Sequence, residues 1–160
     1  EKIKLLIAPH EVNEKSVSET EKKLKERKIK FELFSKFKNE NSEVLVLNTI
    51  GVLARSYAYA DAAYIGGGFN EGLHNVLEAS VWSVPVLFYG ETYVNYNEAV
   101  ELISINAATK VSNVDELAKR FEYYLNEKNK EALKEKIEFY FENNSGVTEK
   151  VLKKIQKSFA

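Results

Sequence analysis

The sequence predicts an α/β domain in which a doubly wound, parallel sheet carries helices on both faces. Strand-like and helix-like segments alternate along the chain, and this order is typical of parallel strands joined by helical connections. One of the strand-like segments, residues 44–47, is an uninterrupted apolar run, as expected for a central strand covered on both faces. The chain has 160 residues, of which 44% are apolar, and this suits one domain with a substantial core.

The spacing of apolar residues predicts the individual elements. Residues 30–35 alternate between polar and apolar side chains, which favours a partly exposed strand. Leu73, Leu77 and Val81 recur every four residues, which favours an amphipathic helix. We expect strands at 3–8, 30–35, 44–47, 62–65, 85–88 and 108–111. We expect helices at 13–28, 51–60, 73–82, 97–106, 115–125 and 130–159, the last interrupted by a helix stop at 143–146.

The composition excludes several classes of protein and site. The formal net charge is -1, so we expect no nucleic acid partner. The chain has no cysteine and only two histidines, so we expect neither a disulfide nor a metal site. No apolar run reaches the ~20 residues that a membrane-spanning helix needs. Because the chain begins with Glu1 and contains no methionine, we expect an excised domain, with any membrane anchor upstream of it.

The turns that follow the predicted strands are the candidate binding sites, because ligands of open parallel sheets bind outside the carboxyl ends of the strands. Four turns occupy that position, at 9–11, 48–51, 66–75 and 90–97. In the third, a buried strand leads into three glycines and then into a predicted helix start near residues 73–75. Glycines let a ligand approach the backbone closely, and a helix start offers unpaired N–H groups to a phosphate.

Glu78 extends this third turn. It follows His74 by four residues, which places both side chains on one face of the predicted helix. A carboxylate there can accept hydrogen bonds from both ribose hydroxyls, so one turn would hold a phosphate and a ribose. The residues alone leave a second interpretation open, in which the glycines form only a tight turn and His74 and Glu78 only an exposed pair. His10, which follows a proline, is also consistent with an ordinary loop residue.

Several familiar site motifs are absent from the sequence. The glycines do not spell G-x-G-x-x-G and they follow a middle strand, which argues against a dinucleotide site. There is no G-x-x-x-x-G-K-[ST], so a P-loop nucleotidase is excluded. No Ser/His/Asp arrangement and no cluster with metal-ligand spacing is present.

The same turns resemble the motifs of one enzyme family. Residues 66–79, GGGFNEGLHNVLEA, resemble the G-G-S…G-G-H-N-x-L-E-P-A signature of Kdo transferases, which move 3-deoxy-D-manno-octulosonate (Kdo) from a CMP-activated donor onto a lipid A precursor. The neighbouring motifs follow in the family's order. APHE at 8–11 resembles A-P-R-H-P-E, NTIG at 48–51 resembles D-T-x-G-E, YADAAYI at 59–65 resembles Y-x-x-A-D-x-A-F-V, VPVLF at 84–88 resembles G-x-P-V-L-F, and NY at 95–96 resembles N-F.

The resemblance covers roughly residues 3–120 and has departures. The arginine of the first turn is missing, and Val52 stands where the family has an acidic residue. Leu73 replaces the second glycine of the signature, Ala79 replaces its proline, and Glu91 replaces the proline after Gly90. These changes affect the phosphate and base contacts and leave His74, Asn75 and Glu78 in place.

The resemblance implies a GT-B glycosyltransferase, built from two Rossmann-like domains that face a cleft. The whole chain, 1–160, would be its C-terminal, donor-binding domain, with extra C-terminal helices. The N-terminal domain, absent from this chain, would carry the acceptor surface and the catalytic base. The implied reaction is transfer of Kdo from CMP-Kdo to a lipid A precursor in lipopolysaccharide biosynthesis, with no metal or cofactor, at the cytoplasmic face of the bacterial inner membrane. This chain alone would be soluble and inactive, because half of the cleft is missing.

The resemblance also implies roles for residues of all four turns. Gly67, Gly68 and Gly72, with His74 and Asn75, would stabilise the phosphate of the departing CMP. No catalytic residue is assigned to this chain.

The remaining implied contacts are with the ribose, the base and the sugar. Glu78 would hold the ribose, His10 would reach the phosphate or the sugar carboxylate, and Asn95 would close the donor side. The cytosine pocket would be lined, mainly through backbone groups, by Thr49, Ile50 and Gly51.

Two alternative functions stay open. Another GT-B enzyme that uses a UDP- or GDP-sugar would need the same phosphate and ribose contacts. A noncatalytic interaction domain would bind no nucleotide, and its charged terminal helices would be the place for a partner.

Overall fold

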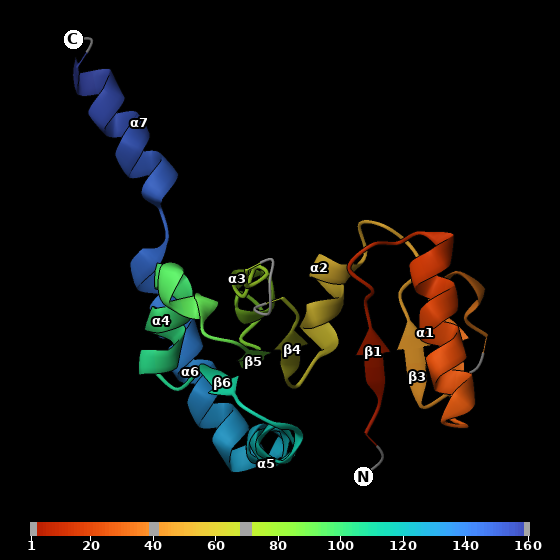
Figure 1. Cartoon of the computed structure of the whole chain (residues 1–160). Coiled ribbons are helices and arrows are strands. Elements are labelled where there is room, and N and C mark those ends of the chain that lie inside the picture. The colour runs from red at the N-terminus through yellow and green to blue at the C-terminus, as the bar shows by residue number, and fades with distance from the viewer. Residues whose placement is uncertain (1–2, 39–41, 68–71, 159–160) are drawn as a thin grey trace. The chain divides into compact units, whose positions relative to one another are not determined.

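The computed structural model of the chain describes residues 3–38, 42–67 and 72–158 (Figure 1). The chain divides into two compact units, residues 1–56 and 57–160. Each unit has its own three-stranded parallel sheet, and the units are described one at a time.

The first unit is a small sheet with one long helix. Its strands lie in the order β1-β3-β2, and β3 pairs in parallel with both neighbours. The Asn13 side chain accepts a hydrogen bond from the Ser16 N–H and so caps α1, whose Leu24 packs with Val44 and Val46 in a buried cluster. The elements are β1 (Leu5–Ile7), α1 (Glu14–Glu26), β2 (Phe31–Leu33), the 3-10 turn η1 (Phe34–Lys36), β3 (Val44–Val46) and α2 (Leu53–Ser56).

The second unit is larger and contains most of the buried residues. Its strands lie in the order β4-β5-β6 and all pair in parallel. The elements are η2 (Tyr57–Tyr59), β4 (Ala63–Ile65), α3 (Leu77–Ser80), β5 (Val86–Tyr89), η3 (Thr92–Asn95), α4 (Asn97–Ser104), β6 (Ala108–Val111), α5 (Val114–Leu125), α6 (Glu127–Asn144) and α7 (Val147–Ser158).

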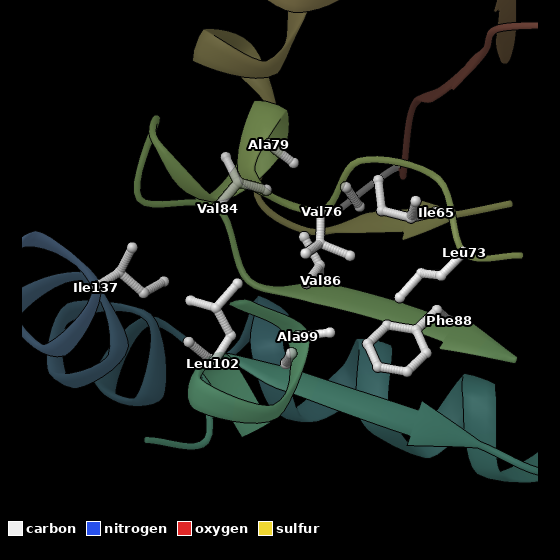
Figure 2. Close-up of a cluster of buried hydrophobic side chains, with 13 residues drawn as sticks. Ile65, Leu73, Val76, Ala79, Val84, Val86, Phe88, Ala99, Leu102 and Ile137 are labelled. Atoms are coloured by element: carbon white, nitrogen blue, oxygen red, sulfur yellow. The ribbon is translucent and has the colours of Figure 1, made fainter. Parts of the chain in front are cut away.

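Helices cover both faces of the second sheet. The two faces can be told apart along β5, because successive side chains of a strand point to opposite sides. Val86 and Phe88 belong to a cluster of 13 buried residues, to which α3, α4 and α6 contribute (Figure 2). Leu87 belongs to a second cluster, on the other side, with Tyr124 of α5 and Leu133 of α6. The long helix α6 thus supplies residues to both clusters.

The end of α6 is part of this local core. Tyr140 and Phe141 pack against the larger cluster. Their rings meet edge to face, with 5.3 Å between the ring centroids. The Tyr140 hydroxyl donates a 2.7 Å hydrogen bond to Glu101 of α4. These side chains therefore join α6 to α4 within the unit.

The predicted fold class is confirmed, with corrections to individual elements. All six predicted strands are present, but their pairing among the described residues gives two three-stranded sheets where the sequence predicted one. The helix predicted at 51–60 is the short α2 followed by the 3-10 turn η2. The helix predicted at 73–82 is wrong at its start, because α3 begins only at Leu77. The predicted stop at 143–146 separates α6 from α7.

Candidate functional site

The turn after β4 is built around two glycines with left-handed backbone. Gly67 and Gly72 have φ of 83° and 84°, a conformation that glycine adopts without steric cost. An antiparallel bridge pairs Gly67 with Leu73, and the His74 N–H donates a 3.3 Å hydrogen bond to the Gly66 carbonyl. The chain therefore doubles back beside the end of β4 before it enters α3. Gly68, predicted as a phosphate contact, lies outside the described residues.

Gly67 and Gly72 also lie too close to their neighbours for any larger residue. A Cβ on Gly67 would collide with the Gly72 carbonyl oxygen, and a Cβ on Gly72 would lie 2.5 Å from the Tyr96 hydroxyl oxygen. Tyr96 belongs to the segment that links η3 to α4. The second glycine thus brings the turn after β4 against an aromatic side chain of the turn after β5.

The expected pairing of His74 with Glu78 on one helical face is wrong, because His74 precedes α3 and lies outside any helix. Asn75 takes the position next to Glu78 instead. Its side-chain oxygen accepts a 2.9 Å hydrogen bond from the Leu77 N–H, and its amide nitrogen donates a 3.4 Å bond to the Glu78 carboxylate. The predicted attraction of the helix start for a phosphate is also weaker than expected. The helix α3 has only four residues, so few peptide dipoles are aligned in it.

In residues 73–78, buried apolar side chains alternate with more exposed polar ones. Leu73 and Val76 are buried in the larger cluster, and they hold the segment against the sheet. His74 is half-buried, whereas Asn75 and Glu78 are exposed. The apolar residues therefore anchor the turn, and the predicted ligand-binding side chains reach its surface.

The Glu78 carboxylate has a tyrosine as neighbour. Burial raises the pKa of the Tyr57 hydroxyl, and the nearby charge of Glu78 raises it further. Tyr57 is therefore a neutral phenol beside the carboxylate at neutral pH. Such a carboxylate can accept hydrogen bonds from ligand hydroxyls.

A cavity of about 350 Å³ lies at this turn. Two predicted residues, His74 and Asn75, line it, and so do two that sequence reasoning did not propose as site residues, Tyr96 and Glu98. Its apolar wall consists of Leu73, Val76 and Leu77. The motif NY at 95–96 was the available signal, but it led to Asn95. That residue is exposed at the end of η3 and does not line this cavity.

A second cavity of similar size lies at the carboxyl ends of β5 and β6. Glu91 and Lys110 form an ion pair of 2.6 Å on its wall, and this contact raises the pKa of the Lys110 amine. Glu91, which stands at the position of the proline in the motif quoted above, thus forms an ion pair with a lysine of β6.

The other predicted residues lie in the first unit. His10 follows β1, and Thr49, Ile50 and Gly51 follow β3. Because β1 and β3 pair in parallel, both turns leave the same edge of that sheet. All four residues are exposed, and Gly51 has φ of 83°. Asn48 shapes the second turn by accepting a 2.9 Å hydrogen bond from the Ser35 N–H and donating one of 2.7 Å to the Ser35 hydroxyl.

The described residues contain neither a candidate metal site nor a candidate membrane-spanning helix. Residues 3–38, 42–67 and 72–158 hold no group of three or more His, Cys, Asp or Glu side chains that would bind a metal ion. Within the same ranges, every helix is too short or too polar to span a bilayer.

Known proteins resemble this chain in sequence. The 3-deoxy-D-manno-octulosonic acid transferase of Chlamydia trachomatis is 33% identical over 144 residues, and that of Aquifex aeolicus is 29% identical over 136 residues. These alignments cover 83% and 84% of this chain. The chain is a relative of the Kdo transferases. A bifunctional glycosyltransferase/methyltransferase of Fusobacterium nucleatum is 29% identical over 94% of the chain. No family model matches it.

This relative of the Kdo transferases spans only part of their length. It covers 31% of the Chlamydia protein, 37% of the Aquifex protein and 23% of the Fusobacterium protein. The C-terminal CMP-Kdo binding domain of WaaA from Acinetobacter baumannii has a similar fold, with a TM-score of 0.71 and 18% identity. That similarity covers 86% of this chain and 89% of the solved domain. The predicted fold class, an α/β domain with parallel strands and helices on both faces, is thereby confirmed.

Proposed function

We propose that this chain is the donor-binding domain of a glycosyltransferase that transfers Kdo from CMP-Kdo to a lipid A precursor. The observation that carries the proposal is the similarity to the Chlamydia and Aquifex Kdo transferases over more than four fifths of the chain. The chain also shares the fold of a domain named for CMP-Kdo binding. The segment at residues 73–76 supports it, since Leu73 and Val76 are buried while His74 and Asn75 line a cavity.

The geometry of the second unit supports two proposed contacts. His74 and Asn75, on the cavity wall, would donate hydrogen bonds to the phosphate, which becomes a leaving group as CMP departs. Glu78 would accept hydrogen bonds from the ribose hydroxyls. Asn75 holds the Glu78 carboxylate by a 3.4 Å hydrogen bond, so the two proposed contacts are coupled.

The rest of the enzyme belongs to the same proposal. An N-terminal domain would supply the acceptor surface and the catalytic base, and the full-length protein would act at the cytoplasmic face of the inner membrane. Single substitutions can test the remaining proposed contacts by their effect on donor affinity. These contacts are those of His10 with the phosphate or sugar carboxylate, of Thr49, Ile50 and Gly51 with the base, and of Asn95 with the donor.

Calorimetric titration of the chain with CMP, UMP and GMP tests the nucleotide class. We expect CMP to bind and the other two to bind more weakly. Binding of UMP or GMP in preference to CMP would contradict transfer from CMP-Kdo. The absence of any nucleotide binding would favour a noncatalytic interaction domain.

Glu78→Gln tests the ribose contact. The change keeps the shape of the side chain but removes its charge, and a hydrogen bond to a charged group contributes about 1.5–3 kcal/mol. We expect CMP affinity to fall roughly tenfold to a hundredfold, since 1.4 kcal/mol corresponds to a factor of ten. Glu135→Gln, on the exposed surface of α6, is the matched control and should bind CMP as the unchanged chain does. Equal affinity of the two variants would contradict the assignment.

A second candidate is a glycosyltransferase with another nucleotide-sugar donor. The alignment of 155 residues with a protein named bifunctional glycosyltransferase/methyltransferase favours this wider assignment. The same titration separates the two candidates, because a UDP- or GDP-sugar enzyme would prefer UMP or GMP.

A further inference from the structure

The cavity beside His74 and Asn75 contains two polar side chains without an assigned role, Tyr96 and Glu98. Both come from the segment that begins α4, and both lie on the wall of the 350 Å³ cavity. Neither is needed for the phosphate and ribose contacts proposed above. They therefore raise the question of what chemistry this wall would recognise.

The position of the Tyr96 ring is fixed by its surroundings. The Tyr96 carbonyl accepts the first hydrogen bonds of α4, from the Ala99 and Val100 N–H groups at 3.0 and 3.2 Å. The ring is half-buried and packs against the larger apolar cluster. Its hydroxyl lies against Gly72, at the point where a Cβ would be 2.5 Å away. The hydroxyl is thus held at one place on the cavity wall.

The Tyr96 hydroxyl has no hydrogen-bond partner among the described residues, although hydroxyls of half-buried tyrosines usually find one. A ligand group that enters the cavity would meet a preorganised donor and acceptor there.

The charges of the wall argue against a second phosphate site. Glu98 contributes a carboxylate, and among the lining residues only His74 is able to carry a positive charge. A carboxylate repels an anion, and it accepts hydrogen bonds readily from hydroxyls. Carboxylate, amide, imidazole and phenol groups around an apolar floor together suit a ring that carries several hydroxyls.

We propose that Tyr96 and Glu98 form a subsite for the hydroxyl groups of a sugar ring, with Tyr96 as a specificity-determining residue of this chain. The proposal rests on the proposed function, since that function supplies the ligand. Two rings of a nucleotide sugar carry such hydroxyls, the ribose of the nucleotide and the transferred sugar. The hydrogen-bonding chemistry is the same for both.

Tyr96→Phe removes the hydroxyl and keeps the ring in the core. We expect its thermal unfolding midpoint to match that of the unchanged chain, and its affinity for CMP-Kdo to fall about threefold to tenfold, as for the loss of one neutral hydrogen bond. Tyr93→Phe is the matched control, because Tyr93 packs its ring on Phe88 at 5.6 Å and does not line the cavity. It should bind CMP-Kdo with unchanged affinity.

Glu98→Gln separates a hydroxyl-binding wall from an anion-binding one. If the carboxylate accepts hydrogen bonds from sugar hydroxyls, its loss weakens binding of CMP-Kdo by about tenfold or more. If Glu98 instead faces the phosphate that His74 and Asn75 are proposed to bind, removal of its repelling charge strengthens binding. Tighter binding of CMP-Kdo by Glu98→Gln would therefore overturn the proposal.

Calorimetric titration of the chain and its variants with CMP and with CMP-Kdo distinguishes the sources. Weaker binding of CMP-Kdo alone by Tyr96→Phe assigns the subsite to the transferred sugar, and equal weakening of both assigns it to the ribose. Unchanged affinity of Tyr96→Phe for both ligands, while the unchanged chain binds them, overturns the subsite alone. Failure of the unchanged chain to bind either ligand overturns the proposed function together with the subsite.

Discussion

At the scale of single residues, the turn after β4 depends on contacts that spacing in the sequence does not reveal. Three consecutive glycines predict a tight turn, and Gly67 and Gly72 do adopt left-handed backbone. Gly72, however, also lies against the Tyr96 hydroxyl, which comes from a segment 24 residues further along the chain. Proximity of this kind arises from the tertiary fold, so the sequence predicted the glycine turn but not the side chain that lies against it.

Gly72→Ala should destabilise the chain more than a glycine substitution in open space. An L-residue at φ of 84° costs about 1–2 kcal/mol, and the collision with the Tyr96 hydroxyl adds a further cost of about 1–3 kcal/mol. Gly146→Ala is the matched control, because Gly146 has φ of 75° and no atom within 4 Å of the added Cβ. Free energies of unfolding from urea titrations measure both effects.

A double variant tests the collision directly. In Gly72→Ala combined with Tyr96→Phe the hydroxyl is gone, and the nearest remaining atom, Cζ, lies at an ordinary contact distance of 3.7 Å. We expect the double variant to be more stable than Gly72→Ala alone, with a favourable coupling energy in the double-mutant cycle. Strict additivity of the two changes would mean that the glycine is required for its φ only.

At the scale of secondary-structure elements, apolar periodicity predicted where helices occur better than where they begin. Leu73, Leu77 and Val81 share a four-residue spacing, yet Leu73 is in a bridge with Gly67 and Val81 follows α3. Leu73 is buried all the same, so the spacing identified an apolar residue correctly and its backbone conformation wrongly. The N-cap of α3 is Val76, which has no side-chain cap. The Leu77 N–H instead donates to the side-chain oxygen of Asn75, a local turn that asparagine favours.

The contact between α4 and α6 gives a pH dependence that belongs to this scale. Burial, followed by the hydrogen bond to Glu101, raises the pKa of Tyr140 to about 12 from its usual 10.0. The folded chain therefore favours the neutral phenol, and this contribution is fully present below pH 10.0. Between pH 10.0 and about 12 the unfolded chain loses the proton first, so the contribution is lost as the pH rises.

Tyr140→Phe should remove this part of the alkaline loss of stability. We expect the difference in unfolding free energy between the unchanged chain and Tyr140→Phe to shrink as urea titrations move from pH 9 towards pH 12. Glu101→Gln should retain much of the dependence, since burial is the larger cause of the shift in pKa. A difference that stays constant over this range would contradict the role of Tyr140.

At the scale of the whole molecule, the alternation of strands and helices predicted the parallel α/β class. It did not predict that the chain divides into two units, each with its own sheet. The local signals in 3–56 and 57–158 are of the same kind, with buried β3 and β5 as their central strands. What differs is the amount of core. Among the described residues, the first unit has one cluster of three buried residues, and the second has clusters of 13 and four. Because burial of apolar surface is the dominant stabilising term, the two units should differ in local stability.

Native-state hydrogen exchange tests this difference with a matched pair of substitutions. Val46 and Val86 are fully buried in the central strands β3 and β5, and Val→Ala at either position removes about 2 kcal/mol of packing and burial. We expect amides of the first unit to exchange faster than those of the second in the unchanged chain. Val46→Ala should accelerate exchange within residues 5–46 and leave residues 63–137 as before, while Val86→Ala should do the reverse. If either substitution accelerated exchange equally in both ranges, the chain would open as one cooperative body, and separate stabilities for the two units would be excluded.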